Sequence, residues 1–77
     1  MEYKKLDTVV LARDLTEEGL CAGDLGAVVE VYEPDGLEVE FVAASGRTSA
    51  VVTLKTADVR HVEDSDHIAV RSAQKSA

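Results

Sequence analysis

Tryptophan is absent from this sequence, and its aromatic residues are limited to Tyr3, Tyr32 and Phe41. A core must therefore be built from aliphatic side chains, above all valine, which is typical of a compact β-sheet. Cys21 is the single cysteine, so no intrachain disulfide can form. Because the first residues also lack the apolar core of a secretory signal, we expect a reducing, cytoplasmic location.

Long apolar runs and an excess of basic charge are also missing. No apolar run approaches the roughly 20 residues that a membrane-spanning helix needs, so we expect no membrane insertion. Residues 1–62 contain twelve Asp and Glu against six Lys and Arg, a formal difference of minus six. Such a field repels phosphate backbones and anionic lipids. The sequence therefore favours a protein partner over nucleic acid or membrane.

The residues that are present form short alternating segments separated by turn residues, a pattern typical of an all-β domain. The clearest segment is 37–42, where Leu37, Val39 and Phe41 are expected inward and Glu38 and Glu40 in water. In all, the pattern predicts five strands, at residues 8–12, 25–32, 37–42, 48–54 and 59–62.

Two of these strands carry more detailed expectations. In segment 25–32, alternation places Val29 and Val31 on one face and Glu30 and Tyr32 on the other. In segment 48–54 the inner face is expected to consist of Ala50, Val52 and Leu54.

The connections are predicted from their turn chemistry. Residues 14–24 contain two glycines and two isolated leucines, Leu15 and Leu20, which indicates a loop pinned to the core at two points. Residues 33–36 have the proline and glycine spacing of a type I turn, in which Gly36 would take a positive φ. A second turn is expected at 44–47 and a single 3₁₀ turn at 55–58.

This order of elements predicts a small five-stranded SH3-like barrel over residues 1–62, with a sheet closed so that no edge is exposed. Residues 63–77 are polar apart from one apolar island at 68–70. We expect them to form a mobile C-terminal tail outside the domain.

Two stretches resemble a known family. Residues 23–32, Gly-Asp-Leu-Gly-Ala-Val-Val-Glu-Val-Tyr, are followed by Pro-Asp-Gly at 34–36 and Glu-Val-Glu-Phe-Val at 38–42. Together they are similar to an uncharacterised family of small bacterial SH3-like domains, the domain of unknown function 4926, over about residues 8–62. The resemblance implies no catalytic residue. Because members are often encoded near candidate toxin genes, it implies an antitoxin or immunity-type role.

The candidate partner-binding residues are Glu30, Tyr32, Glu38 and Glu40, which alternation brings to one outward face of two neighbouring strands. An acidic face with one aromatic anchor suits a basic protein, by electrostatic steering and by burial of the ring. Simple solvation of the carboxylates is the competing interpretation.

Two other groups have reactive side chains but a weaker pattern. The acids and imidazoles at 61–67 have metal-ligand chemistry, yet their spacing matches no established motif, so a solvated charged end is favoured and no metal is expected. Cys21 has acidic neighbours, which disfavour a reactive thiolate, and is interpreted as a small packed loop residue.

The sequence therefore predicts a non-enzymatic protein-binding module without a cofactor, because no nucleophile and base are paired in it. Two alternatives stay open. One is a nucleic-acid-associated small barrel, although its cations Arg13, Arg47, Lys55 and Arg60 are scattered. The other is a structural homo-oligomer without a ligand, in which the apolar island at 68–70 adds a strand to a neighbour.

Overall fold

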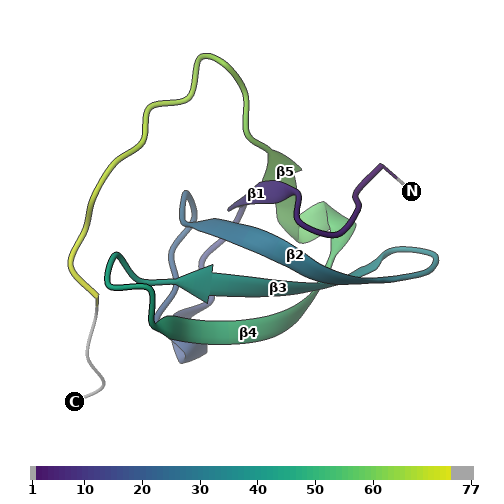
Figure 1. Ribbon diagram of the computed structural model, residues 1–77, viewed down its shortest axis with the longest axis horizontal. Helices are drawn as coiled ribbons and strands as arrows, with labels where there is room; N and C mark the ends of the chain where they lie inside the picture. The colour runs from purple at the N-terminus through teal and green to yellow at the C-terminus, as the bar shows by residue number, and fades with distance from the viewer. Residues whose placement is uncertain (1, 74–77) are drawn as a thin grey trace.

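The computed structural model describes residues 2–73 and shows an all-β domain (Figure 1). Its five strands confirm the five predicted segments to within a residue or two at each end. They are β1 (Thr8–Leu11), β2 (Leu25–Tyr32), β3 (Gly36–Val42), β4 (Thr48–Lys55) and β5 (Val59–His61). Two short 3₁₀ helices, η1 (Thr16–Glu18) and η2 (Thr56–Asp58), complete the regular structure. No helix among the described residues is long and apolar enough to cross a membrane.

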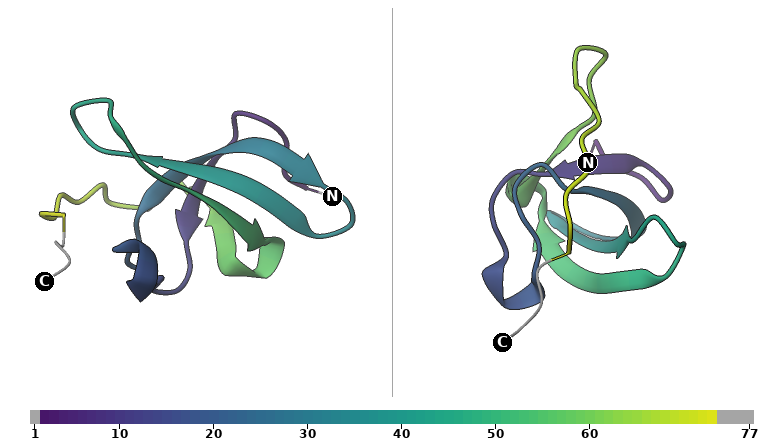
Figure 2. Two further views of the ribbon diagram at one scale, coloured as in Figure 1. Left: turned by 90° about the horizontal axis from the view of Figure 1, so that it is seen from below. Right: turned by 90° about the vertical axis from the view of Figure 1, so that its left-hand side faces the viewer.

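All five strands form one antiparallel sheet in the order β4-β3-β2-β1-β5. Figure 2 shows how strongly β2, β3 and β4 twist across the body of the domain. Within residues 2–73, β4 and β5 are the two outer strands of the sheet and are not hydrogen-bonded to each other. The sheet is therefore not closed into a barrel. The all-β fold is confirmed, but the closed SH3-like barrel expected from the sequence is not.

The core lies on one face of this sheet, and β3 supplies its centre. Leu37 and Val39 are fully buried and Phe41 is 2% exposed, which confirms the predicted inward face of β3. Leu54 is buried opposite Leu37, while Ala50 and Val52 pack against the same cluster from β4. The remaining buried members are aliphatic and come from the other strands and the first loop: Val9, Leu11, Leu20, Val28 and Val59.

Strand β2 contains an irregularity that alternation did not predict. The register shifts between Val28 and Glu30, so that Val29 is the extra residue of a β-bulge. Val28 is fully buried and Val29 is 36% exposed, whereas Val31 returns to the core side and packs against the cluster. The prediction that Val29 and Val31 share one face is therefore wrong, because the bulge inserts one residue between two stretches of regular alternation.

Gly26 is needed for close packing between β2 and β3. A Cβ atom at this position would lie 2.6 Å from Cγ1 of Val39 and 2.9 Å from Cε1 of Phe41. The backbone of β2 thus passes directly over two core side chains, which only glycine allows.

Both hairpin turns lie at the predicted positions, but the backbone conformation of Gly36 differs from the prediction. Residues Glu33, Pro34 and Asp35 form the turn between β2 and β3, and Gly36 is already a strand residue paired with Tyr32. Gly36 does not have the positive φ expected of it; Gly46, in the second turn, does, with φ of 91°. The difference arises because pairing with Tyr32 keeps Gly36 in the extended conformation of the ladder.

The loop after β1 is attached to the core at the two predicted leucines. Leu20 is 6% exposed, Leu15 packs against the core cluster, and their backbones pair with each other across η1. The 3₁₀ turn predicted at 55–58 is confirmed as η2, whose Asp58 side chain accepts the backbone N–H of Lys55 at 2.9 Å.

Residues 62–73, here called the C-terminal segment, leave β5 and run along the outside of the domain without forming a strand (Figures 1 and 2). Two ion pairs join it to the domain, one between Arg60 and Asp66 and one between Arg71 and Asp24. The predicted mobility of the tail stays a prediction, and residues 74–77 lie outside the described part.

The two faces of the sheet can be tested with a matched pair of substitutions. Val39→Ala should lower the free energy of unfolding by about 2 kcal/mol, because Val39 is fully buried. Val51→Ala, one strand away on the opposite face and 50% exposed, should change it by less than about 0.5 kcal/mol. Urea unfolding of both variants measures the difference, and equal losses would contradict the assignment of the faces.

Candidate partner-binding face

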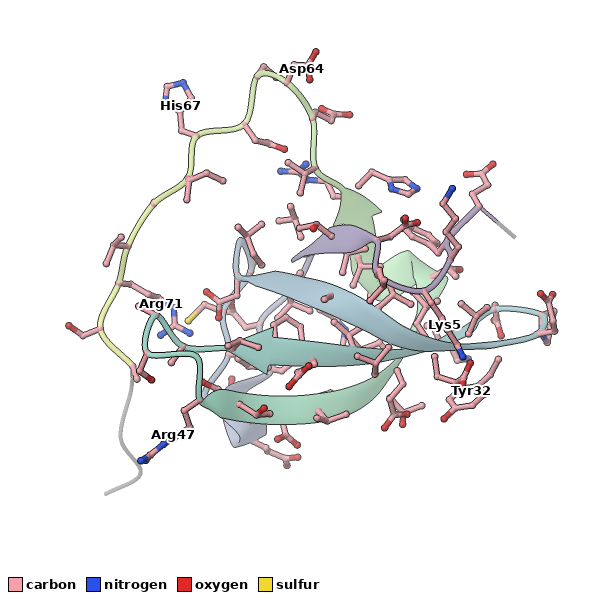
Figure 3. The ribbon with its side chains drawn as sticks, in the orientation of Figure 1. Lys5, Tyr32, Arg47, Asp64, His67 and Arg71 are labelled. Carbon is pink, nitrogen blue, oxygen red and sulfur yellow. The ribbon has the colours of Figure 1, made fainter. Side chains whose placement is uncertain are left out.

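The four residues predicted to bind a partner lie on the sheet face opposite the core. Glu30 and Tyr32 project from β2, and Glu38 and Glu40 project from β3. The three carboxylates are half-buried, and Tyr32 is 47% exposed. We call this surface the acidic face; Figure 3 shows Tyr32 on it, at one end of the molecule.

Glu30 and Glu38 are directly opposite each other across the β2–β3 ladder. Like charges in this position destabilise a sheet. One cation offsets the pair among the described residues: the Nζ atom of Lys5 lies 3.5 Å from Oε1 of Glu30, in an exposed ion pair that contributes little. The face therefore retains a net negative charge that a positively charged group could neutralise.

Hydroxyl groups hold the second carboxylate in place. The Tyr32 hydroxyl and Thr53 Oγ1 both donate to Oε1 of Glu38, at 3.3 Å and 2.9 Å. The negative charge of Glu38 raises the pKa of Tyr32, with desolvation, this hydrogen bond and the charge of Glu30 adding to the effect. Tyr32 therefore stays neutral and acts as a hydrogen-bond donor next to two carboxylates.

Glu40 extends the acidic face along β3. It lies between Ala27 of β2 and Val51 of β4, and it accepts a hydrogen bond from the Thr48 hydroxyl. Because Val51 is 50% exposed, this end of the face combines one carboxylate with apolar surface.

The acids and imidazoles at 61–67 do not converge. The ring of His61 stacks on Tyr3, with centroids 4.3 Å apart, while Asp66 pairs with Arg60 and His67 is exposed. Within residues 2–73, no group of three or more His, Cys, Asp or Glu side chains is arranged to hold a metal ion.

Cys21 lies half-buried in the loop after β1. Its backbone N–H donates to Oδ2 of Asp24 at 2.8 Å, so the residue takes part in the turn that precedes β2. This position agrees with the interpretation of Cys21 as a packed loop residue.

The scattered cations are partly neutralised by neighbouring acids. Arg13 Nε donates to Asp58 at 2.8 Å, and Arg60 makes two bonds of 2.9 Å to Asp66. The Arg60 bonds and the Glu63 backbone N–H lower the pKa of Asp66 to about 2. No basic stripe thus forms from Arg13 and Arg60.

One feature of the surface was missed by sequence reasoning. Arg71 reaches from the C-terminal segment to Asp24 and to the backbone carbonyl of Gly19, across 47 and 52 residues of sequence. The only local hint is that Arg71 follows the apolar island at 68–70. Nothing in the pattern indicates which carboxylate it meets.

Comparison with known proteins gives one result. A family described as "Domain of unknown function (DUF4926)" matches residues 5–61. The chain belongs to this family. The matched region of the DUF4926 domain contains all five strands and the whole acidic face, whereas the C-terminal segment lies beyond it. No curated protein and no solved structure matches the chain.

The electrostatics of the acidic face can be measured at Tyr32. Glu38→Gln should lower the pKa of Tyr32 toward its ordinary value, because it removes the main negative charge that opposes ionisation of the phenol. NMR titration of the tyrosine ring signals resolves Tyr32 from Tyr3. Glu40→Gln is the matched control and should leave the Tyr32 titration nearly unchanged; an equal shift in both variants would contradict the described geometry.

Proposed function

We propose that the DUF4926 domain is a non-enzymatic protein-binding module whose acidic face binds a basic partner protein. The observation that carries the proposal is the direct opposition of Glu30 and Glu38 on an open face, beside the exposed ring of Tyr32. The carboxylates and the aromatic ring of this face are suited to recognition of a cationic group.

The energetics of the face favour a cationic ligand. Two opposed carboxylates cost stability in the free domain, and a lysine or arginine placed between them would remove that repulsion on binding. The ring of Tyr32 offers apolar area and a fixed hydroxyl, the combination found at energetically important interface positions. Binding would thus gain from both charge neutralisation and burial.

The order of elements supports assignment of the domain to the SH3-like barrel class. A long loop follows β1, two hairpins join β2, β3 and β4, and a 3₁₀ turn precedes β5, which returns to pair with β1. This arrangement exposes one broad face of β2, β3 and β4, on which the acidic residues lie.

A narrower version of the proposal is an antitoxin or immunity-type inhibitor in the bacterial cytoplasm. The net charge of −7 and the acidic face support it, since an inhibitor of a basic protein gains a fast, electrostatically steered association. The nucleic-acid alternative has less support, because Arg13 and Arg60 are paired with acids.

Partner capture with the full chain tests the proposal. Combining Glu30→Gln, Glu38→Gln and Glu40→Gln should weaken binding to a basic protein, such as the product of a neighbouring gene, by roughly three- to hundredfold. Raising the salt concentration should weaken the wild-type complex and have less effect on the variant. Calorimetry or surface plasmon resonance measures both effects.

The matched control removes three carboxylates away from the face, at Glu17, Glu63 and Asp64, and so changes the net charge equally. This control should retain most of the affinity. Salt-insensitive binding, or equal losses in the two triple variants, would contradict a role for the acidic face. Strong binding of RNA or DNA at low salt would favour the nucleic-acid alternative instead.

A further inference from the structure

A second surface lies at the other end of the molecule, where the C-terminal segment crosses the domain. In Figure 3, Arg71 and Arg47 lie at the end opposite Tyr32 and Lys5. A groove of about 700 Å³ opens between the C-terminal segment and the domain. Its volume is in the range of ordinary ligand sites.

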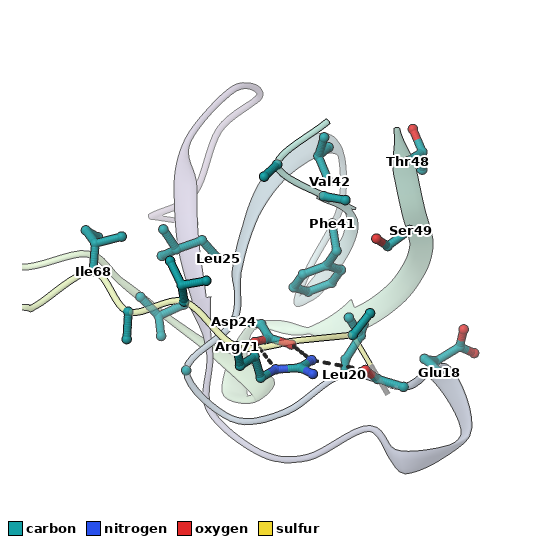
Figure 4. Close-up of a pocket in the computed structure, with 18 of the residues that line it drawn as sticks. Glu18, Leu20, Asp24, Leu25, Phe41, Val42, Thr48, Ser49, Ile68 and Arg71 are labelled. Atoms are coloured by element: carbon teal, nitrogen blue, oxygen red, sulfur yellow. Dashed lines mark hydrogen bonds and ion pairs between the residues drawn. The ribbon is translucent and has the colours of Figure 1, made fainter. Parts of the chain in front are cut away.

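Part of the domain side of this groove is apolar. Its wall includes Leu20, Leu25, Phe41 and Val42 (Figure 4). Leu25 and Val42 are 38% and 48% exposed, so the C-terminal segment leaves much of the wall uncovered. The segment's own apolar residues do not fill the space either, because Ile68 is 70% exposed and Val70 is 98% exposed.

Arg71 lines the groove and joins the C-terminal segment to the domain by a specific contact. Its Nε and Nη2 atoms donate to Oδ1 and Oδ2 of Asp24 at 3.0 Å and 2.6 Å, and Nη2 also donates to the Gly19 carbonyl at 3.0 Å (Figure 4). Two parallel bonds to a carboxylate fit the planar guanidinium and not an ammonium group. We call the Asp24 carboxylate and the Gly19 carbonyl the arginine site.

The domain itself holds the arginine site in position. The backbone carbonyl of Asp24 accepts the N–H of Leu11 at 2.8 Å, and the N–H of Cys21 donates to the Asp24 side chain. Neither contact involves the C-terminal segment. The site therefore persists when Arg71 leaves, and a partly exposed ion pair of this kind holds the segment only weakly.

We propose that the arginine site and the adjoining apolar groove bind an extended segment of a partner protein, in which an arginine is flanked by aliphatic residues, and that Arg71 occupies the site in its absence. The charge of Asp24, with Glu18 nearby on the groove wall, complements the arginine. Aliphatic side chains of the partner would cover Leu25 and Val42, which the C-terminal segment leaves exposed. The partner would then displace the segment because it fills the groove as well as the arginine site.

The test uses full-length protein with Arg71→Gln and a synthetic peptide with the sequence of residues 66–73, Asp-His-Ile-Ala-Val-Arg-Ser-Ala. NMR signals of the Cys21 and Asp24 amides report occupancy of the arginine site and also show that the variant is folded. The peptide should bind this variant with a Kd about two- to sixfold lower than that of the wild type, because the site is no longer self-occupied.

Matched controls distinguish specific recognition of an arginine side chain from a general effect of positive charge. Arg47→Gln makes the same charge change on the groove wall and should leave the affinity at the wild-type level. A peptide with glutamine or lysine in place of its arginine should bind the Arg71→Gln protein at least about tenfold more weakly. Adding Asp24→Asn to that protein should cause a similar loss.

Three results would overturn the proposal: no binding to the Arg71→Gln protein, equal binding of the substituted peptides, or no effect of Asp24→Asn. A wild-type dimer that Arg71→Gln converts to monomer, measured by light scattering, would also overturn it, since the occupant would then be the C-terminal segment of a second copy. Substitution of Glu30 and Glu38 should leave peptide binding unchanged, so this test is independent of the acidic face.

Discussion

The structure depends on the burial of one row of side chains, Leu37, Val39 and Phe41, along the central strand β3. Each contributes roughly 1.5–3 kcal/mol when it leaves water, a large share of the stability of so small a domain. The neighbouring strands pack against this row of side chains. Gly26 lets β2 approach Val39 and Phe41 closely, and Leu54 of β4 covers Leu37. The same alternation forces Glu38 and Glu40 to the opposite face.

That opposite face carries an electrostatic cost that the core has to offset. Glu30 and Glu38 meet across the ladder because the bulge at Val29 shifts the register by one residue after the Val28–Val39 pair. Lys5 and the hydroxyl of Tyr32 relieve the repulsion in part. The acidic face stands on β2 and β3, each of which is paired with a neighbouring strand on both sides. Such a fixed arrangement of charge would favour the selective recognition of a basic partner that we propose.

The two proposed surfaces differ in how they are built. The acidic face is formed by strands inside the family-matched region, while the groove at the other end is bordered by the C-terminal segment, which lies beyond that region. A contact made by an extended segment through one arginine can be exchanged without disturbing the core. In the two proposals, the acidic face is a fixed surface, and the groove is a surface whose occupant changes.

The sequence by itself determined the five strands, the inner face of β3, the pinning leucines of the first loop and the outward position of the acidic residues. These follow from local periodicity and turn chemistry, which act over a few residues. Only the tertiary structure decided the bulge at Val29, the extended Gly36, the open sheet and the contact of Arg71 with Asp24. Each of these features depends on a contact between residues that are far apart in the sequence or on neighbouring strands. Local periodicity and turn chemistry do not indicate which residues will make such contacts.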